Sequence, residues 1–112
     1  PIWLGGSADA VLKRAAELGD GWMPILPPDD TANIALDKLD NHLNKFNRSR
    51  NEFGIEAWLR FHDNDPDAWA KAADGWRELG ADMAMLYPMW KVSGIDSQIE
   101  ILERFQQVAR AK

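Results

Sequence analysis

The chain has 112 residues, a length typical of one domain, and its formal net charge at pH 7 is −5. This acidic balance lacks the basic footprint of a nucleic-acid binder and the basic cluster of a membrane-surface binder. Cysteine is absent, which excludes disulfides, thiolate metal sites and a cysteine nucleophile. No apolar run approaches the roughly 20 residues of a membrane span. We expect no signal segment and a cytoplasmic location.

The first half of the chain predicts two strands and two helices. A short apolar run at residues 2–4 predicts a strand that ends at two glycines. Ser7 is the predicted N-cap of the next helix, and Gly19 is the predicted C′ residue that ends it. Residues 21–26 predict the second strand. Asp29 offers a cap for a second helix, whose inward stripe is predicted to be Ala32, Leu36, Leu39, Leu43 and Phe46.

The next segment predicts a third strand and a third helix. Apolar and polar residues alternate over residues 55–61, which is typical of a strand. Asp65 and Pro66 are placed to open a helix, in which Trp69 and Trp76 share a face and predict core packing. The aspartates around this point have the spacing of a calcium loop. The proline, and the lack of a glutamate at the twelfth position, favour a helix cap instead.

The last strand and helix follow the same order. Residues 83–87 form a near-continuous apolar run and predict the fourth strand. Residues 87–90 could contact a planar ligand, or they could be ordinary packing at the rim of the sheet. Ser97 and Glu100 have the spacing of a capping box. The predicted inward stripe of the final helix is Ile101, Leu102, Phe105, Val108 and Ala109.

The few candidate polar residues outside these patterns favour structural roles. His42 lies on a polar stretch of the second helix and is predicted to be solvent-exposed. His62 follows the third strand, where barrel enzymes build their sites, but its polar surroundings favour an exposed loop. Two histidines so far apart in sequence do not predict a metal site. Arg60 faces either the lumen of a barrel or the helices around it. The polar segment 47–51 predicts a frayed helix end.

Strict alternation of strands and helices predicts an α/β fold with parallel strands and right-handed crossovers. Four βα units are half of a (β/α)₈ barrel, which needs about 250 residues. The alternative is a small, open, doubly wound sheet. Residues 1–112 show no linker and are read as a single unit. Six tryptophans, and a start at Pro1 in place of methionine, suggest a piece of a larger protein.

The segment most informative about function is the turn Gly5-Gly6-Ser7 between the first strand and its helix. Glycines permit positive φ and close approach of a ligand to the backbone. The free N–H groups of a first helical turn favour an anion such as phosphate, and Ser7 could add a hydroxyl donor. The same residues also suit a tight βα turn without a ligand. Asp9 argues against an anion, because its carboxylate occupies the same helix dipole.

Residues 1–22, PIWLGGSADAVLKRAAELGDGW, resemble the signature of the luciferase-like monooxygenase family. That family includes bacterial luciferase and other FMN- or deazaflavin-dependent oxidoreductases. It commonly has a strand ending in Gly-Gly-Ser, an alanine-rich helix, and then Ala-Asp-Gly-Trp. Here Gly19 stands where alanine is usual. Residues 67–88, DAWAKAADGWRELGADMAMLYP, resemble the late helix and strand of the family.

The resemblance implies a TIM barrel, of which this chain is the C-terminal half-barrel fragment. It implies FMN or a deazaflavin as cofactor and a small organic substrate in the intact enzyme. Gly5, Gly6 and Ser7, with the backbone amides of Ala8 and Asp9, match the loop that grips the flavin phosphate. Trp22, Met23 and Pro24 could line the site near the ring system. The family's N-terminal half carries most catalytic residues, so the catalytic residues are unknown and the isolated chain is expected to be inactive.

A second hypothesis is a non-catalytic (βα)₄ structural domain. An open four-stranded sheet has strand edges that invite pairing, and this predicts a homodimer with two-fold symmetry. The two hypotheses differ in whether the Gly5-Gly6-Ser7 turn binds an anion.

Overall fold

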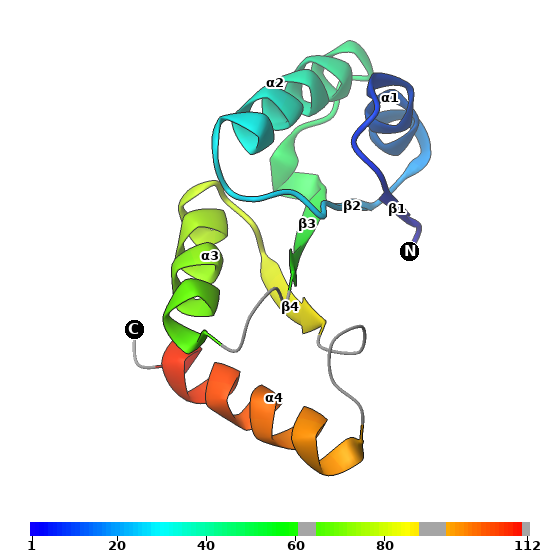
Figure 1. Ribbon diagram of the computed structural model, residues 1–112. Helices are drawn as coiled ribbons and strands as arrows, with labels where there is room; N and C mark the ends of the chain where they lie inside the picture. Colours follow the sequence, from blue (N-terminus) through cyan, green and yellow to red (C-terminus); the bar gives the residue numbers. More distant parts are fainter. Residues whose placement is uncertain (61–64, 88–93, 111–112) are drawn as a thin grey trace.

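The computed structural model describes residues 1–60, 65–87 and 94–110. Predictions that fall on residues 61–64 and 88–93, among them those for His62 and Trp90, lie outside this part of the chain. Within it, four strands alternate with four helices (Figure 1). Their bounds are β1 (Trp3–Gly5), α1 (Asp9–Leu18), β2 (Gly21–Met23), α2 (Asp30–Lys45), η1 (Arg50–Glu52), β3 (Gly54–Arg60), α3 (Pro66–Glu78), β4 (Met83–Tyr87) and α4 (Ile95–Arg110).

The sheet is wound as in a barrel. Its strand order is β1-β2-β3-β4, and all three neighbouring pairs are parallel. A doubly wound sheet reverses its strand order at a switch point, and the described strands show no such reversal. Right-handed crossovers between consecutive strands place all the helices on one face. Figure 1 shows the helices following one another around the periphery, from α1 to α4. The predicted α/β class with four βα units of a TIM barrel is confirmed.

The two faces of the sheet differ in burial, because successive side chains of a strand point to opposite sides. On the helix-covered face, five side chains are at most 5% exposed: Trp22, Ile55, Ala57, Leu59 and Leu86. On the same face, Leu4 is half-buried and Ala84 on the outer strand β4 is exposed. The opposite face, called the inner face here, carries half-buried or exposed side chains: Trp3, Met23, Glu56, Trp58, Arg60, Met83, Met85 and Tyr87. Arg60 therefore lies on the side that forms the lumen of a barrel.

Trp3 lies across β2 and β3 on the inner face. A Cβ atom at Gly21 or at Gly54 would come within 2.3 Å of the Trp3 ring. These two glycines are partners in the β2–β3 register. Only glycine fits at positions 21 and 54, because the indole of Trp3 covers β2 and β3 there.

The helices bury most of the stripes that the sequence predicts; Phe46, Phe105, Val108 and Ala109 are only half-buried, and Leu102 is exposed. On α2, Ala32, Leu36, Leu39 and Leu43 are buried, and on α3 so are Trp69 and Trp76. The ring of Trp76 meets that of Trp22 edge to face, with centroids 6.5 Å apart, which joins α3 to the sheet. On α4, Ile101 is buried, but Leu102 is 45% exposed. The prediction for Leu102 is wrong because α4 packs on α3, with Phe105 against Trp69, and presents that position to solvent.

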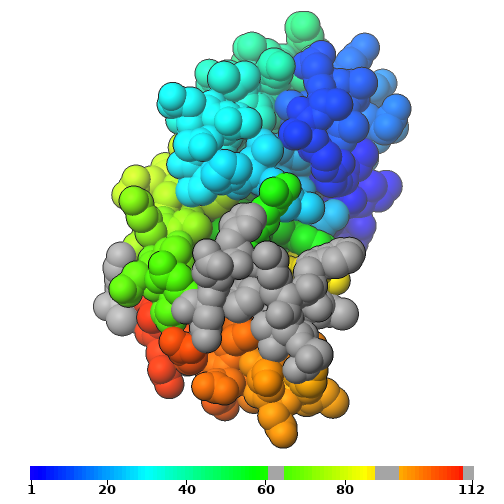
Figure 2. Space-filling model, viewed as in Figure 1, coloured from blue at the N-terminus to red at the C-terminus, as the bar shows by residue number. Residues whose placement is uncertain are grey.

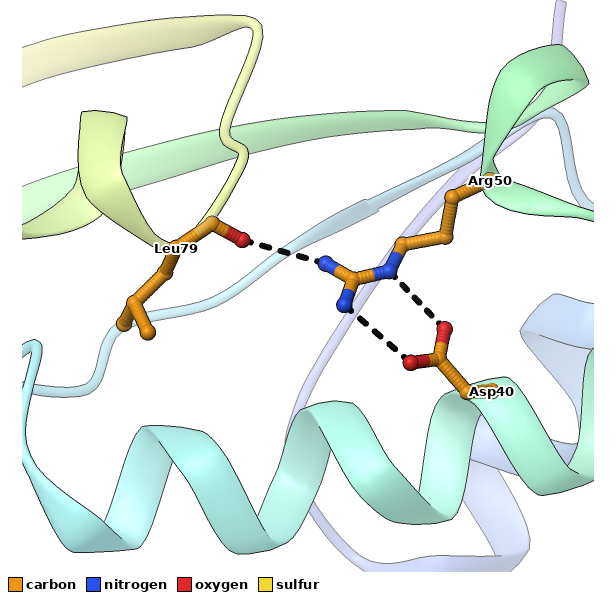
Figure 3. A network of polar contacts seen from close by, with 3 residues as sticks. All are labelled: Asp40, Arg50 and Leu79. Atoms are coloured by element: carbon orange, nitrogen blue, oxygen red, sulfur yellow. Dashed lines mark hydrogen bonds and ion pairs between the residues drawn. The ribbon is translucent and has the colours of Figure 1, made fainter.

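The segment after α2 is held by two arginines and is not frayed, contrary to the prediction. Arg50 makes a two-pronged contact with Asp40, at 2.8 and 3.1 Å, and also donates to the carbonyl of Leu79 at 3.1 Å (Figure 3). Arg48 donates from Nη1 to the carbonyls of Ala16 and Gly19, each at 2.8 Å. Both carbonyls lie at the end of α1, where carbonyl groups have no hydrogen-bond partner within the helix itself.

Two aspartates tie neighbouring strands together at their amino ends. Asp20 precedes β2, and its carboxylate accepts the N–H of Ile2 at 2.6 Å. Asp82 precedes β4, and its carboxylate accepts the N–H of Ile55 at 2.8 Å. The aspartate of the Gly-Asp-Gly-Trp motif therefore has a structural contact. It lies at the end of the barrel opposite to the face where such enzymes bind ligands.

Two helices begin where the sequence predicts, because the capping side chain bonds to an N–H group only two or three residues further along the chain. Asp29 accepts from the N–H of Thr31 at 2.9 Å, and Asp65 accepts from the N–H groups of Asp67 and Ala68. Both predicted caps are confirmed, and the aspartate run around Asp65 is a cap as expected.

Strand β2 ends at Met23 and not at the predicted residue 26, and three other predicted helix boundaries are wrong. Ala8, not Ser7, is the N-cap of α1, because its carbonyl accepts the first helical N–H groups. Gly19 is the C-cap in extended conformation and not a left-handed C′ residue. Helix α4 begins at Ile95, so Ser97 lies inside it and forms no capping box. The helix starts early because the carbonyl of Gly94 already accepts the N–H of Gln98.

Candidate functional site

The candidate site lies where β1 and β2 end. Gly5 is the last residue of β1 and pairs in register with Met23, the last residue of β2. Carboxyl ends of parallel strands meet at one edge of the sheet, which is the edge where barrel enzymes bind their ligands. Residues 5–9, called the glycine turn here, connect β1 to α1 and are all exposed. The structure thus brings the predicted site residues Gly5–Asp9 and Met23 to the same edge.

The buried side chain of Trp22 holds the glycine turn through a hydrogen bond. Its side chain is completely buried on the helix-covered face, and its indole Nε1–H donates to the carbonyl of Gly6 at 2.6 Å. Gly6 has a φ of +101°, a conformation that a residue with a side chain adopts only at a cost. The shape of the turn therefore depends on a glycine at position 6 and on a hydrogen bond from position 22. Trp22 itself presents no surface to a ligand.

The first turn of α1 presents N–H groups to solvent. The N-cap Ala8 has no side-chain cap bond, and its carbonyl accepts from the N–H groups of Val11 and Leu12. The N–H groups of Asp9 and Ala10 have no acceptor within the described residues. Such groups, together with the positive end of the helix dipole, favour an anion.

The carboxylate of Asp9 is held to one side of this helix end by His42. His42 Nε2 donates to Asp9 Oδ1 at 2.8 Å. This hydrogen bond lowers the pKa of Asp9 below its ordinary value, and the charges of His42, Lys38 and Lys45 act in the same direction, against desolvation. The carboxylate is therefore ionised and engaged with α2.

The prediction that His42 is solvent-exposed is wrong, since it is only 9% exposed. Helix α2 packs on α1, and this position faces that contact. Position 42 is three residues after Leu39, within one helical turn, so its place at the edge of the apolar stripe was the available signal. His42 Nδ1 is buried and has no hydrogen-bond partner within residues 1–60, 65–87 and 94–110.

Neither a metal site nor a membrane helix occurs in the part of the chain that the structure describes. No three histidine, aspartate or glutamate side chains there are grouped so that they could hold a metal ion. No helix there is both long and apolar enough to cross a bilayer.

Comparison with known proteins gives one match. The family model for luciferase-like monooxygenases matches residues 1–110, which is nearly the whole chain. No curated protein and no solved structure matches it. The matched segment includes the glycine turn, the four strands and their helices. The chain belongs to the luciferase-like monooxygenase family.

Proposed function

We propose that this chain is part of an oxidoreductase that uses FMN or a deazaflavin, and that its glycine turn binds the cofactor phosphate. The observation that carries this proposal is the pair of N–H groups at Asp9 and Ala10. They have no acceptor among the described residues and follow a turn held open by Gly6. Membership of a family that is generally flavin-dependent supports the choice of cofactor.

The residues present fit a phosphate group. The turn is exposed, and no side chain at Gly5 or Gly6 blocks approach to the backbone. The Ser7 hydroxyl can add a donor beside the two N–H groups. The Asp9 carboxylate would repel a phosphate. Its hydrogen bond with His42 at 2.8 Å holds the carboxylate toward α2 and so reduces this repulsion. We assign His42 the role of a positioning residue for this carboxylate.

The two residues on β2 have different proposed roles. Met23 ends β2 on the inner face and is half-buried, which supports our assignment of Met23 as a contact of the cofactor ring system. Trp22 positions the turn through the Gly6 carbonyl. The bound flavin or deazaflavin supplies the hydride chemistry, and these residues bind and orient it.

We further propose that residues 1–112 form one unit that requires another half-barrel for turnover. A closed barrel has eight strands, and the described part of this chain supplies four. The inner face carries Trp58 and Tyr87, with ring centroids 5.7 Å apart, and both are only half-buried. The substrate would be a small organic molecule bound between the two halves.

Titration of the chain with FMN and with a deazaflavin tests the phosphate assignment. Gly6→Ala places a side chain at a φ of +101° inside the turn, and Gly94→Ala places one at +93° at the start of α4, where a Cβ meets nothing within 4 Å. Both variants carry similar backbone strain, about 1–2 kcal/mol. We expect at least a tenfold loss of affinity only for Gly6→Ala. Equal affinities for both variants, or no binding by the unsubstituted chain, would refute the assignment.

The second candidate function is a self-associating structural domain, which the exposed apolar side chains at the two ends of the sheet favour. At one end, Ile95, Ile99 and Leu102 of α4 are 45–76% exposed. At the other end, Ile2 beside β1 and Leu18 of α1 are 59% and 62% exposed. Figure 2 shows α1 and α4 at opposite ends of the molecule. A two-fold axis along the barrel would place β4 of one copy beside β1 of the other.

Sedimentation of the chain and of Ile99→Glu tests this candidate. A dimer that dissociates in the variant supports it, and a monomer at micromolar concentration contradicts it. Ser97→Glu on the same helix is a control, because position 97 is exposed and polar.

A further inference from the structure

A groove with a volume of about 230 Å³ lies beside the start of β4, between α3 and the second half of α4. Its walls are mostly small and apolar, with lining residues that include Ala73, Trp76, Ala81, Ala84, Phe105 and Ala109. Two polar residues also line it, and both are already engaged. Arg77 donates to Asp74 at 2.6 Å, and Asp82 accepts the N–H of Ile55 at 2.8 Å. The groove therefore offers apolar surface.

The groove lies where a further strand would continue the sheet. Helix α1 contacts both β1 and β2, and α3 contacts both β3 and β4. Helix α4 follows β4 in the same order, but no strand lies beyond β4 in the described sheet. Ala84 is consequently exposed on the helix-covered face, where Leu86 of the same strand is 5% exposed, and Phe105 and Ala109 of α4 are only half-buried. The groove thus fits an apolar side chain from a strand parallel to β4.

The opposite edge of the sheet carries such a side chain. Strand β1 pairs only with β2 in the described sheet. Ile2 extends this pairing, because its carbonyl accepts the N–H of Asp20 at 2.6 Å. It lies two residues before Leu4, so its side chain points to the same, helix-covered face. Ile2 is 59% exposed, and Leu18 at the end of α1 is 62% exposed, so this edge also lacks an apolar partner.

The groove and these exposed side chains lie at the same end of the barrel. Ile2 and Ala84 are at the amino ends of β1 and β4, and Leu18 and Ala109 are at the carboxyl ends of α1 and α4. In βα units the amino ends of strands and the carboxyl ends of helices share one end of the barrel. The four described strands are half of the eight in a closed barrel. Two copies related by a two-fold axis would therefore bring Ile2 level with the groove and leave no open edge.

We propose that the groove under α4 binds Ile2 of a second copy of this chain, with β4 of each copy pairing with β1 of the other. Each copy contributes one groove and one Ile2, so the same contact occurs twice in the dimer. The inference specifies the interface of the self-associating domain and rests on that second candidate function. It requires no flavin.

Sedimentation velocity of three variants tests the interface. Ile2→Glu removes the apolar side chain, and Ala84→Phe fills the groove from its own strand. Ile34→Glu is the matched control, because Ile34 is 57% exposed, carries the same change of charge and lies on α2, between the two edges in chain order. We expect the dissociation constant of the dimer to rise at least tenfold for Ile2→Glu and for Ala84→Phe, and less than twofold for Ile34→Glu. Circular dichroism checks that each variant is folded.

Mixing Ile2→Glu with Ala84→Phe separates this interface from any other mode of self-association. Each variant alone has both contacts of its dimer altered. In a mixed dimer one contact is intact, since the unaltered groove of the Ile2→Glu chain receives Ile2 of the Ala84→Phe chain. The mixture should therefore dimerise at least tenfold more tightly than either variant alone.

The outcomes distinguish this inference from the functions proposed above. A dimer that neither substitution weakens overturns the inference and leaves self-association through another face. A mixture that associates no better than its separate components overturns it as well. A monomer of the unsubstituted chain at micromolar concentration overturns both the inference and the second candidate function, and the groove then fits a strand of a different half-barrel. Binding of FMN at the glycine turn is decided independently of all three results.

Discussion

The hydrogen bond from Trp22 to Gly6 allows the sharpest test of how the candidate site is held. Trp22→Phe removes the indole N–H that lies 2.6 Å from the Gly6 carbonyl and keeps an aromatic ring in the core. The bond is only partly buried, so water can reach the freed carbonyl and its loss costs about 1 kcal/mol. The smaller ring leaves unfilled space around a side chain that is 0% exposed, which costs about 1–2 kcal/mol more.

The expected loss of unfolding free energy is therefore about 2–3 kcal/mol. For a chain of this length that corresponds to a fall in Tm of roughly 8–15 °C. Thermal and urea unfolding followed by circular dichroism measure the stability. Loosening of the glycine turn should also lower the affinity for the cofactor phosphate by about tenfold, a change of about 1.4 kcal/mol, in a fluorescence titration with FMN.

Trp76→Phe is the matched control. Trp76 is 1% exposed, contacts the ring of Trp22, and donates a comparable hydrogen bond to Leu26 at 3.0 Å. This variant should lose similar stability and keep its affinity for FMN, because its carbonyl partner lies outside the glycine turn. If both variants lose FMN affinity equally, the Trp22–Gly6 bond has no specific role. If Trp22→Phe leaves FMN affinity unchanged, the turn is rigid without it.

Three further predictions follow from other contacts. Gly54→Ala should destabilise the chain by about 1–3 kcal/mol, because its Cβ would overlap Trp3, and the same change in a Trp3→Ala background should be neutral or stabilising in urea unfolding. Because the pKa of Asp9 is lowered in the folded chain, its hydrogen bond with His42 stabilises the fold above pH 3.8, and this stabilisation is lost as the pH falls through the folded pKa. Asp9→Asn should therefore be less stable than the unsubstituted chain at pH 6, and the two should have the same stability near pH 2. Arg50→Met should lower the free energy of unfolding by about 1 kcal/mol, mainly because the carbonyl of Leu79 loses its donor, since the partly exposed ion pair with Asp40 contributes little. An unchanged Tm would contradict this.

Local patterns identified the elements and two of the helix caps. The alternation of apolar runs and helical periods predicted four βα units, and Asp29 and Asp65 cap their helices as expected because the cap bond spans only two or three residues. The glycine turn was also predictable, since Gly5-Gly6-Ser7 requires only adjacent residues. Ser7 was not the N-cap, because the carbonyl of Ala8 accepts the first helical bonds; the general preference for serine over alanine at this position pointed to the wrong neighbour.

Contacts between distant segments decided the remaining features. His42 is buried only because α2 packs on α1, and its partner Asp9 is 33 residues away. Trp22 acts through Gly6 across 16 residues and faces the helices, not a ligand. The loop after β2, the end of β3 and helix α3 converge around a cavity of about 120 Å³, and no local pattern predicts it.

The sequence by itself determined that this is an acidic α/β chain of four βα units with a glycine turn after its first strand, because hydrophobic period and turn chemistry are local properties. Tertiary structure decided which face each tryptophan occupies, and that the sheet is wound as in a barrel. It also decided which donors have partners: the indoles of Trp22 and Trp76 donate to carbonyls, and that of Trp58 has no acceptor among the described residues. The physical reason is that strand order and pairing bring together residues far apart in the chain, and only then are burial and hydrogen bonding settled.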